Sequence, residues 1–220
     1  MVSRLSNEQQ KNEEEEVKKD EILESPLFIP MPALETQLRA TALYGEIDEE
    51  RSKDCIGSLM HLFESGKEYL ENDENPDEVI ESYSPMELLI STEGGHVHEM
   101  FSIYDVLRQI RSKCTVQTTG LGKVMSAGVL LLAAGTKGER KVGKHCRLML
   151  HPISGGNFGD IREMERNIKE IRWLEKVYSE ALFEETNMSK KKITSILKKD
   201  RDTFFDAQQA VEWGIADHVI

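Results

Sequence analysis

Residues 121–128 have the sequence LGKVMSAG and lie between two segments of different character. Before them, residues 114–119 (CTVQTT) alternate polar and apolar side chains and are rich in β-branched residues, which is typical of a strand. After them, residues 129–134 (VLLLAA) form a short apolar run of good helix formers. Gly120 and Gly122 supply the break between the two segments. The sequence therefore predicts a strand, a tight turn and a buried helix.

Ser126 stands where the predicted helix begins. A serine at this position can cap the helix by accepting a backbone N–H hydrogen bond, or it can be a small residue that lets the turn pack closely. It can also be a nucleophile, because the free N–H groups and the positive dipole end of a helix start stabilise a developing oxyanion. The turn alone leaves these uses open.

Length and charge narrow the class of protein. A chain of 220 residues is long enough for one domain with a sizeable core. Its net charge of −12 argues against nucleic-acid binding, because a phosphate backbone repels it. Cys55, Cys114 and Cys146 have no metal-type spacing, which indicates free thiols in a reducing compartment. We find no signal-peptide pattern and no apolar run of about 20 residues, so we predict a cytoplasmic protein without a membrane segment.

The first 37 residues differ from the rest of the chain. Residues 1–24 are polar and charged, with four glutamates at 13–16, and they are predicted to be a solvated tail. Residues 25–37 interleave apolar side chains with three prolines, which favours an extended segment that docks on its own domain or on a partner. We therefore predict an N-terminal extension over 1–37 and a folded domain over 38–220.

The next part of the chain alternates strand and helix patterns. The predicted elements are a strand at 41–45, a helix at 48–69, a loop at 71–84, a strand at 86–91, a turn at 92–95, a helix around 100–110, and strands at 114–119 and 147–150. Strand–turn–helix–strand units form parallel sheets with right-handed crossovers, so the predicted fold class is α/β. The turns at 92–95 and 121–128 then lie at the carboxyl ends of strands, where open α/β sheets place their sites. Gly94 and Gly95 can serve a tight turn or bare backbone N–H groups for an oxyanion.

A long helix dominates the C-terminal part. Asp160 is a good cap, Glu163 occupies the reciprocal position, and helical spacing of apolar residues continues to about Glu185. Such a helix is about 39 Å long, so part of its apolar stripe is expected to pack against another subunit. The remaining predicted elements are a lysine-rich helix with a solvated face at 189–199, a short helix from Asp206 to Gly214, and a closing strand at 215–220.

Three residues fit one chemistry when they are considered together. A serine hydroxyl such as that of Ser126 needs a base to take its proton, and His151, at the end of a predicted strand, suits that task near neutral pH. A carboxylate on the far ring nitrogen would hold the imidazole in the right tautomer. Asp202 is the candidate, and Asp200 is the alternative if the register slips by two residues.

From about Leu38 to Ile220 the sequence resembles the Clp protease proteolytic subunit family, which are ATP-dependent caseinolytic serine peptidases. The resemblance rests on five motifs, namely ISTEGG (90–95), GKVMSAG (122–128), LMLH (148–151), RDTF (201–204) and AQQAVEWG (207–214). Each motif is weak alone, but the five occur in the family's order and at closely matching spacing. The resemblance implies a crotonase-like spiral of ββα units with a long protruding handle helix, and a catalytic triad of Ser126, His151 and Asp202.

The same matching implies further properties. The backbone N–H groups of Gly95 and Ala127 should form the oxyanion hole, and neither a cofactor nor a metal is expected. The helix that starts at Asp160 corresponds to the handle by which family members join two heptameric rings into a homo-oligomer. The rings enclose the active sites, so unfolded proteins or short peptides are the implied substrates, and an AAA+ unfoldase that hydrolyses ATP usually feeds them.

The chain also departs from the family pattern. Glu93 stands where the family usually has proline, and Pro152 follows His151 directly, where the family commonly has one residue between. The short axial loop that contacts the unfoldase is not recognisable in residues 1–37, which leaves the unfoldase partner open. None of these departures removes a member of the triad.

Two other functions fit the same pattern. One is a catalytically silent or regulatory ring subunit, which labelling of Ser126 by a fluorophosphonate would distinguish from a peptidase. The other is an acyl-CoA hydratase or isomerase of the crotonase superfold, which needs acid/base carboxylates in place of the serine and histidine. His96 and His98 could share a metal, but no third ligand lies near them in the sequence, and we predict no metal site.

Overall fold

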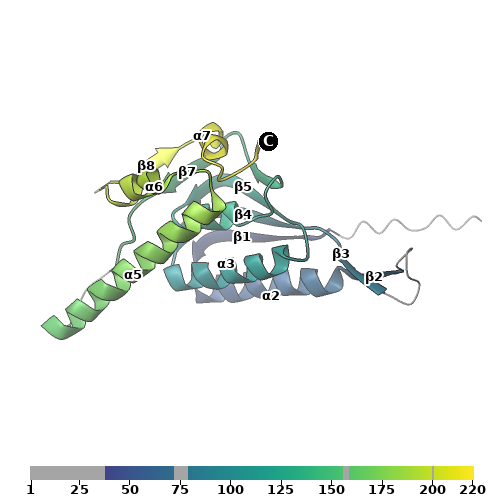
Figure 1. The fold of residues 1–220 in the computed structure, drawn as a ribbon, viewed down its shortest axis with the longest axis horizontal. Helices are drawn as coiled ribbons and strands as arrows, with labels where there is room; N and C mark the ends of the chain where they lie inside the picture. Colours follow the sequence, from purple (N-terminus) through teal and green to yellow (C-terminus); the bar gives the residue numbers. More distant parts are fainter. Residues whose placement is uncertain (1–37, 72–78, 156–158, 200) are drawn as a thin grey trace, which may run out of the picture. The chain divides into compact units, whose positions relative to one another are not determined.

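The structure is a computed structural model of the chain (Figure 1). It describes residues 38–71, 79–155, 159–199 and 201–220. The predictions for residues 1–37 and for Asp200 lie outside the described residues. Arg39–Ile220 form one compact unit, which holds every helix and strand discussed below.

A mostly parallel sheet organises this unit. The strands are β1 (Ala40–Ile47), β4 (Met86–Gly95), β5 (Val116–Met125), β6 (Arg140–Val142), β7 (Arg147–Leu150), β8 (Thr203–Phe205) and β9 (His218–Val219). Strands β1, β4, β5, β6 and β9 are neighbours in that order and all run parallel. Strand β7 pairs in parallel with the end of β5, and β8 pairs with β7 in antiparallel fashion. The predicted α/β class with parallel strand–helix–strand units is confirmed.

Strand β5 forks between two neighbours. Its middle pairs with β6 over Thr118–Gly120, whereas its end pairs with β7 over Lys123–Met125. The prediction that the strand stops at residue 119 is therefore wrong. The glycines do not end the strand, because Gly122, with φ +63°, absorbs the kink at which β5 leaves one partner for the other.

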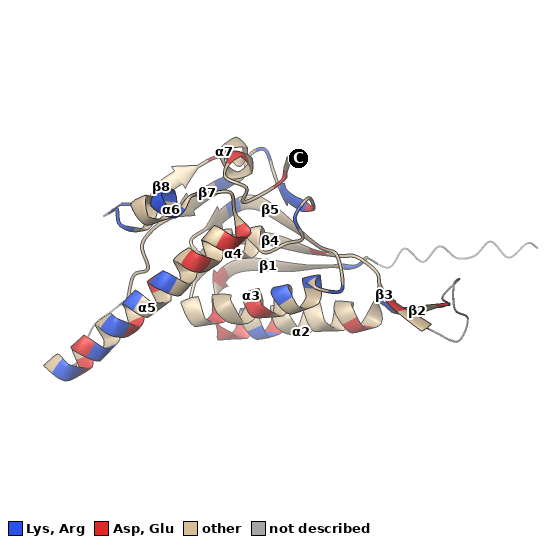
Figure 2. Cartoon of the chain, in the orientation of Figure 1, with Lys and Arg blue, Asp and Glu red and all other residues tan. Residues whose placement is uncertain are grey.

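The helices cover the sheet and extend beyond it. They are α2 (Glu49–Ser65), α3 (Val97–Arg111), α4 (Ala127–Ala133), α5 (Ile161–Glu185), α6 (Lys190–Leu197) and α7 (Ala207–Glu212). Helix α2 packs against β1 and α3, and all seven residues of α4 are buried. The long helix α5 begins at its predicted cap, where the side chain of Asp160 accepts a hydrogen bond from the Glu163 N–H. Its core-facing residues lie only in its second half, while basic and acidic residues alternate along its length (Figure 2).

A small hairpin replaces two predicted elements. The helix predicted to reach residue 69 ends at Ser65, and Gly66 donates its N–H to the last helical carbonyls. Strands β2 (Lys67–Glu71) and β3 (Val79–Tyr83) then pair in antiparallel fashion, so the prediction of a loop over 71–84 is also wrong. The hairpin leaves most of its apolar side chains exposed. Its strands therefore lack the alternation of buried and exposed residues by which a strand is recognised in a sequence.

The predicted turn at residues 92–95 is part of a strand. Strand β4 continues to its last residue, Gly95, which pairs with Ile47 after a shift in the register. Both glycines adopt positive φ angles, of 97° at Gly94 and 154° at Gly95. The positive φ values fit the backbone freedom of glycine, but the chain bends within the strand and turns only at His96, where α3 begins.

A buried ion pair anchors the end of α5 to the sheet. Arg140 donates from Nε and Nη2 to the Asp217 carboxylate at 2.8 and 2.6 Å, and from Nη1 to the Glu185 carbonyl at 2.9 Å. Desolvation raises the pKa of Asp217, but the hydrogen bonds from Arg140 and from the Gly138 N–H outweigh it and lower the pKa to about 2. Because this pKa lies below the ordinary value of 3.8, the pair stabilises the fold above pH 3.8, and the stabilisation is lost as the pH falls from 3.8 towards 2.

Asp217→Asn is expected to lower the free energy of unfolding at pH 7 by on the order of 3 kcal/mol, because it leaves the buried Arg140 guanidinium without its counter-charge. The difference from the wild type should narrow as the pH falls from about 4 towards 2, because the unfolded chain takes up the Asp217 proton over this range and the folded carboxyl becomes protonated only near pH 2. Urea unfolding at a series of pH values measures both effects. Asp105→Asn removes an exposed aspartate and serves as the control. A loss in the free energy of unfolding that is the same at every pH would contradict the stabilising role of the ion pair between Asp217 and Arg140.

Among the described helices, none combines the length and the hydropathy that a membrane-spanning helix needs.

Candidate active site

Ser126 joins β5 to α4 in a strained backbone conformation. Its φ and ψ are 54° and −120°, and it is the one residue other than glycine with positive φ within the described ranges. Such a conformation costs on the order of 1–3 kcal/mol and persists only where the surroundings impose it. The Ser126 N–H donates to the Met149 carbonyl of β7 at 2.7 Å. The side chain makes no capping hydrogen bond to α4, so it is free for other chemistry.

His151 follows directly after β7 and faces this serine. Its Nε2 lies 2.8 Å from Ser126 Oγ, which is hydrogen-bonding distance. Strand β7 brings the two together, because its pairing with the end of β5 sets Met149 opposite Met125, one residue before Ser126. With its Nε2 unprotonated, the imidazole can accept the hydroxyl proton and leave an oxygen nucleophile.

Asp202 precedes β8, is exposed, and is not engaged with the histidine. In the part of the chain that the structure describes, no hydrogen bond or ion pair joins Asp202 to His151. The strand register nevertheless points to this residue. Strand β8 pairs Thr203 with Leu150, so one further step along the same ladder sets Asp202 opposite His151.

The two glycines of β4 allow the backbone to approach the serine closely. A Cβ atom on Gly94 would lie 2.7 Å from Ser126 Cβ, and one on Gly95 would lie 2.3 Å from the Ile47 carbonyl oxygen. The buried Thr92 holds this segment, because its Oγ1 accepts from the Gly94 N–H at 2.9 Å. Gly95 and Ala127 line the same cavity, and Ala127 is the first residue of α4, whose N–H has no acceptor within the helix.

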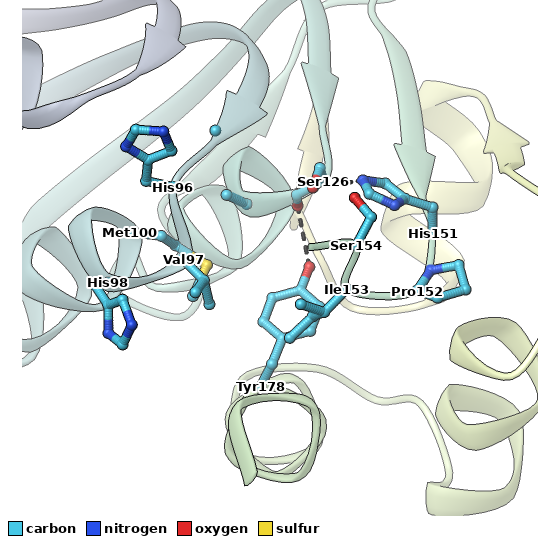
Figure 3. Close-up of a pocket in the computed structure, with 12 residues that line it drawn as sticks. His96, Val97, His98, Met100, Ser126, His151, Pro152, Ile153, Ser154 and Tyr178 are labelled. Carbon is cyan, nitrogen blue, oxygen red and sulfur yellow. Dashed lines mark hydrogen bonds between the residues drawn. The ribbon is translucent and has the colours of Figure 1, made fainter. Parts of the chain in front are cut away.

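A cavity of about 280 Å³ opens beside Ser126 and His151 (Figure 3). Its wall is largely apolar, with side chains of Val97, Met100 and Ile153. An apolar cavity next to a nucleophile suits an apolar side chain of a substrate.

The histidines of α3 lie apart from this chemistry. His96 and His98 also border the cavity, but Figure 3 shows their rings directed away from the pair formed by Ser126 and His151. Across the described ranges, no three histidine, cysteine, aspartate or glutamate side chains are grouped so that they could hold a metal ion.

Tyr178 of α5 is a member of the site that the sequence analysis did not identify. It lies in the apolar stripe of the helix, yet its hydroxyl donates to the Ser126 carbonyl at 3.0 Å (Figure 3). Burial raises the pKa of Tyr178, so the hydroxyl stays protonated and remains a donor. A tyrosine among the aliphatic residues of a buried stripe indicates a hydrogen bond, because a buried phenol usually finds a hydrogen-bond partner. The partner itself is visible only in three dimensions.

One family recurs when the chain is compared with known proteins. The model of the family described as Clp protease matches residues 36–220. The chain is 38% identical over 175 residues to the ATP-dependent Clp protease proteolytic subunit 2 of Chlamydia trachomatis serovar D, and the match covers 80% of this chain and 77% of the relative. It is 36% identical over 182 residues to subunit 1 of Corynebacterium jeikeium, covering 83% and 87%. A solved structure of a ClpP1 mutant from Listeria monocytogenes is similar with a TM-score of 0.68 and 28% identity, covering 83% of this chain and 91% of that one.

Proposed function

Because this chain belongs to the Clp protease family and is a serine peptidase, we propose that Ser126, His151 and Asp202 are its catalytic triad. Its fold is the crotonase-like fold of that family. The observation that carries the proposal is the 2.8 Å contact between His151 Nε2 and Ser126 Oγ. At this distance a general base takes the proton of a serine hydroxyl during nucleophilic attack.

The reaction follows from the positions of these groups. Ser126 Oγ attacks the carbonyl carbon of a peptide bond, its proton passes to His151 Nε2, and the carbonyl π electrons move onto the oxygen. The N–H groups of Gly95 and Ala127 are assigned to that oxyanion. The imidazolium then gives its proton to the leaving amine as the C–N bond breaks. A water molecule hydrolyses the acyl-enzyme by the same steps, with His151 again as the base.

Asp202 is assigned to the far nitrogen of His151. The register of β7 and β8 supports Asp202 over Asp200, because one step beyond its last pair, Leu150 with Thr203, would set residue 202 opposite residue 151. Residues directly opposite in an antiparallel pair have Cα atoms about 5 Å apart, so a change of side-chain rotamer is enough to bring a carboxylate to the ring. A carboxylate in that place stabilises the imidazolium and selects the productive tautomer.

The proposed substrates are unfolded proteins and short peptides. Family members form oligomeric rings that work with Clp ATPases. We assign this chain to stacked heptameric rings whose interior holds the active sites, with an AAA+ unfoldase as the source of extended chains. Residues 1–37 are assigned to an extension outside the catalytic domain, since the family match begins at residue 36. The cytoplasm is the proposed location.

Helix α5 is the proposed contact between rings. Its first half carries exposed apolar side chains, and Ile161 is 77% and Ile168 41% exposed. They are seven residues apart and share one face of the helix. Apolar side chains of this size in a row mark an interaction surface.

Ile161→Glu combined with Ile168→Glu is therefore expected to release single rings or smaller species, because the added carboxylates would be buried in the contact. Analytical ultracentrifugation measures the particle mass. Arg166→Glu adds the same charge on the opposite side of the same helix and is the matched control. An unchanged mass in the double variant would refute the role of α5.

One observation favours a second function. Among the described residues no hydrogen bond or ion pair joins Asp202 to His151, and an unconnected triad is what a catalytically silent ring subunit would show. The acyl-CoA hydratase or isomerase alternative lacks comparable support, because no aspartate or glutamate is among the described residues that line the cavity.

A fluorophosphonate probe on the assembled protein separates the two functions. The probe reacts with a serine oxygen only where that oxygen is activated, and mass spectrometry of the labelled peptide identifies the residue. Labelling of Ser126 in a particle of ring mass supports the peptidase. A particle of ring mass without labelling overturns the catalytic triad in favour of a silent subunit. A species of monomer mass overturns the ring assembly.

A further inference from the structure

Hydrogen bonds hold the backbone of Ser126 at both its N–H and its carbonyl group. The Ser126 N–H is bound by the Met149 carbonyl of β7, at 2.7 Å. The Ser126 carbonyl accepts from the Val129 N–H at 3.0 Å within the first turn of α4, and from the Tyr178 hydroxyl at 3.0 Å. The contact with Tyr178 is the one that ties this strained residue to a distant helix.

We propose that Tyr178 is a positioning residue that fixes the orientation of the nucleophile and of the oxyanion-binding N–H. The inference rests on the proposed function, which assigns the Ala127 N–H to the oxyanion. The Ser126 carbonyl and the Ala127 N–H belong to one planar peptide group, so a hydrogen bond that orients the carbonyl also orients the N–H. A donor on the carbonyl also polarises the N–H at the other end of the group.

The strain at Ser126 explains why an additional hydrogen bond is needed to hold this peptide in place. A φ of 54° with a ψ of −120° is rarely populated by a residue with a side chain, so the peptide would rotate to a relaxed conformation if nothing opposed it. Rotation would turn the Ala127 N–H away from the substrate and move Oγ relative to His151. Tyr178 opposes the rotation from a rigid position, because its side chain is only 4% exposed and its ring is packed below the serine (Figure 3).

Removing the Tyr178 hydroxyl leaves the Ser126 carbonyl with the Val129 N–H as its one described donor in place of two. The remaining donor belongs to α4 itself, so the hydrogen bond from outside the turn is lost. The aromatic ring would remain, so packing of α5 against the site would be retained.

Tyr178→Phe tests the inference, and Tyr104→Phe is the matched control. Tyr104 is the other buried tyrosine with a side-chain hydrogen bond to a described partner, and its hydroxyl donates to Glu185 Oε1 at 2.8 Å, away from Ser126. Both variants lose one buried hydroxyl. For Tyr178→Phe we expect kcat for a fluorogenic peptide to fall about tenfold with KM nearly unchanged. The affinity for a peptide boronate, whose tetrahedral adduct uses the oxyanion site, should fall by a similar factor. Particle mass should stay at the wild-type value, and Tyr104→Phe should change none of these three quantities.

Two results would overturn the inference. The first is a Tyr178→Phe protein with wild-type kcat and boronate affinity. The second is an equal loss of kcat in both variants, which would indicate a general effect of stability. Failure of the proposed function is recognised separately, because the wild-type protein would then not be labelled by the fluorophosphonate. In that event a crystal structure of Tyr178→Phe still tests the positioning role of Tyr178. A peptide between residues 126 and 127 that keeps its wild-type orientation in this variant refutes that role.

Discussion

Ser126→Ala abolishes peptide hydrolysis, with an expected loss in kcat of about 10⁶-fold, and leaves the particle mass unchanged. The loss is this large because the hydroxyl oxygen forms the covalent bond, and no other group at the site can replace it. The fold should tolerate the change. The serine side chain does not cap α4, its described hydrogen bond is the one to His151, and alanine adds no atom to a crowded turn.

Ser195→Ala is the control for this prediction. Ser195 is an exposed serine of α6 and does not line the cavity, so its loss should leave kcat near the wild-type value. A peptide-cleavage assay with labelling by a fluorophosphonate measures both variants. Wild-type turnover in Ser126→Ala, or labelling that persists in that variant, would show that another residue is the nucleophile.

Asp202→Asn is expected to reduce kcat by about 10⁴-fold while the assembled particle persists. An asparagine keeps the size of the side chain but carries no charge for the imidazolium, and its amide can stabilise the wrong tautomer of His151. Since Asp202 is exposed and makes no described hydrogen bond, the substitution should cost little stability.

Asp200→Asn is the matched control, because it makes the same chemical change two residues earlier. Steady-state kinetics of the two variants assign the carboxylate. If Asp200→Asn is the damaging change, the ladder between β7 and β8 does not continue to His151. If neither variant loses turnover, the serine and histidine work without a carboxylate.

Much of the fold could be predicted from the sequence because its elements have strong periodic patterns. The helix from Asp160 to Glu185 has both a cap and a long apolar stripe, and the structure places it at Ile161–Glu185. The segment at residues 67–83 could not be predicted in this way. Its strands are exposed, so they lack the alternation of buried and solvent-facing residues on which strand prediction depends.

The candidate site was predictable in part for a similar reason. Ser126 is predicted at the start of a helix and His151 at the end of a strand, and the structure brings their side chains within a hydrogen bond of each other. The structure does not do this for Asp202, because its side-chain orientation is not encoded in any sequence pattern. Tyr178 escaped detection because a helical stripe shows that it is buried but not which atom its hydroxyl meets.

The ladder between β7 and β8 has a consequence for how this protein can change over evolutionary time. The pairing of Leu150 with Thr203 sets the distance between His151 and the proposed acid Asp202 across two strands and not along the chain. The segment between these two strands, which includes α5, can therefore change in length while the strand pairing stays the same. The outer part of α5 can gain or lose whole turns by insertion or deletion without changing that distance. If α5 joins subunits as proposed, lineages can vary this contact while they keep the pairing that sets the two proposed catalytic positions.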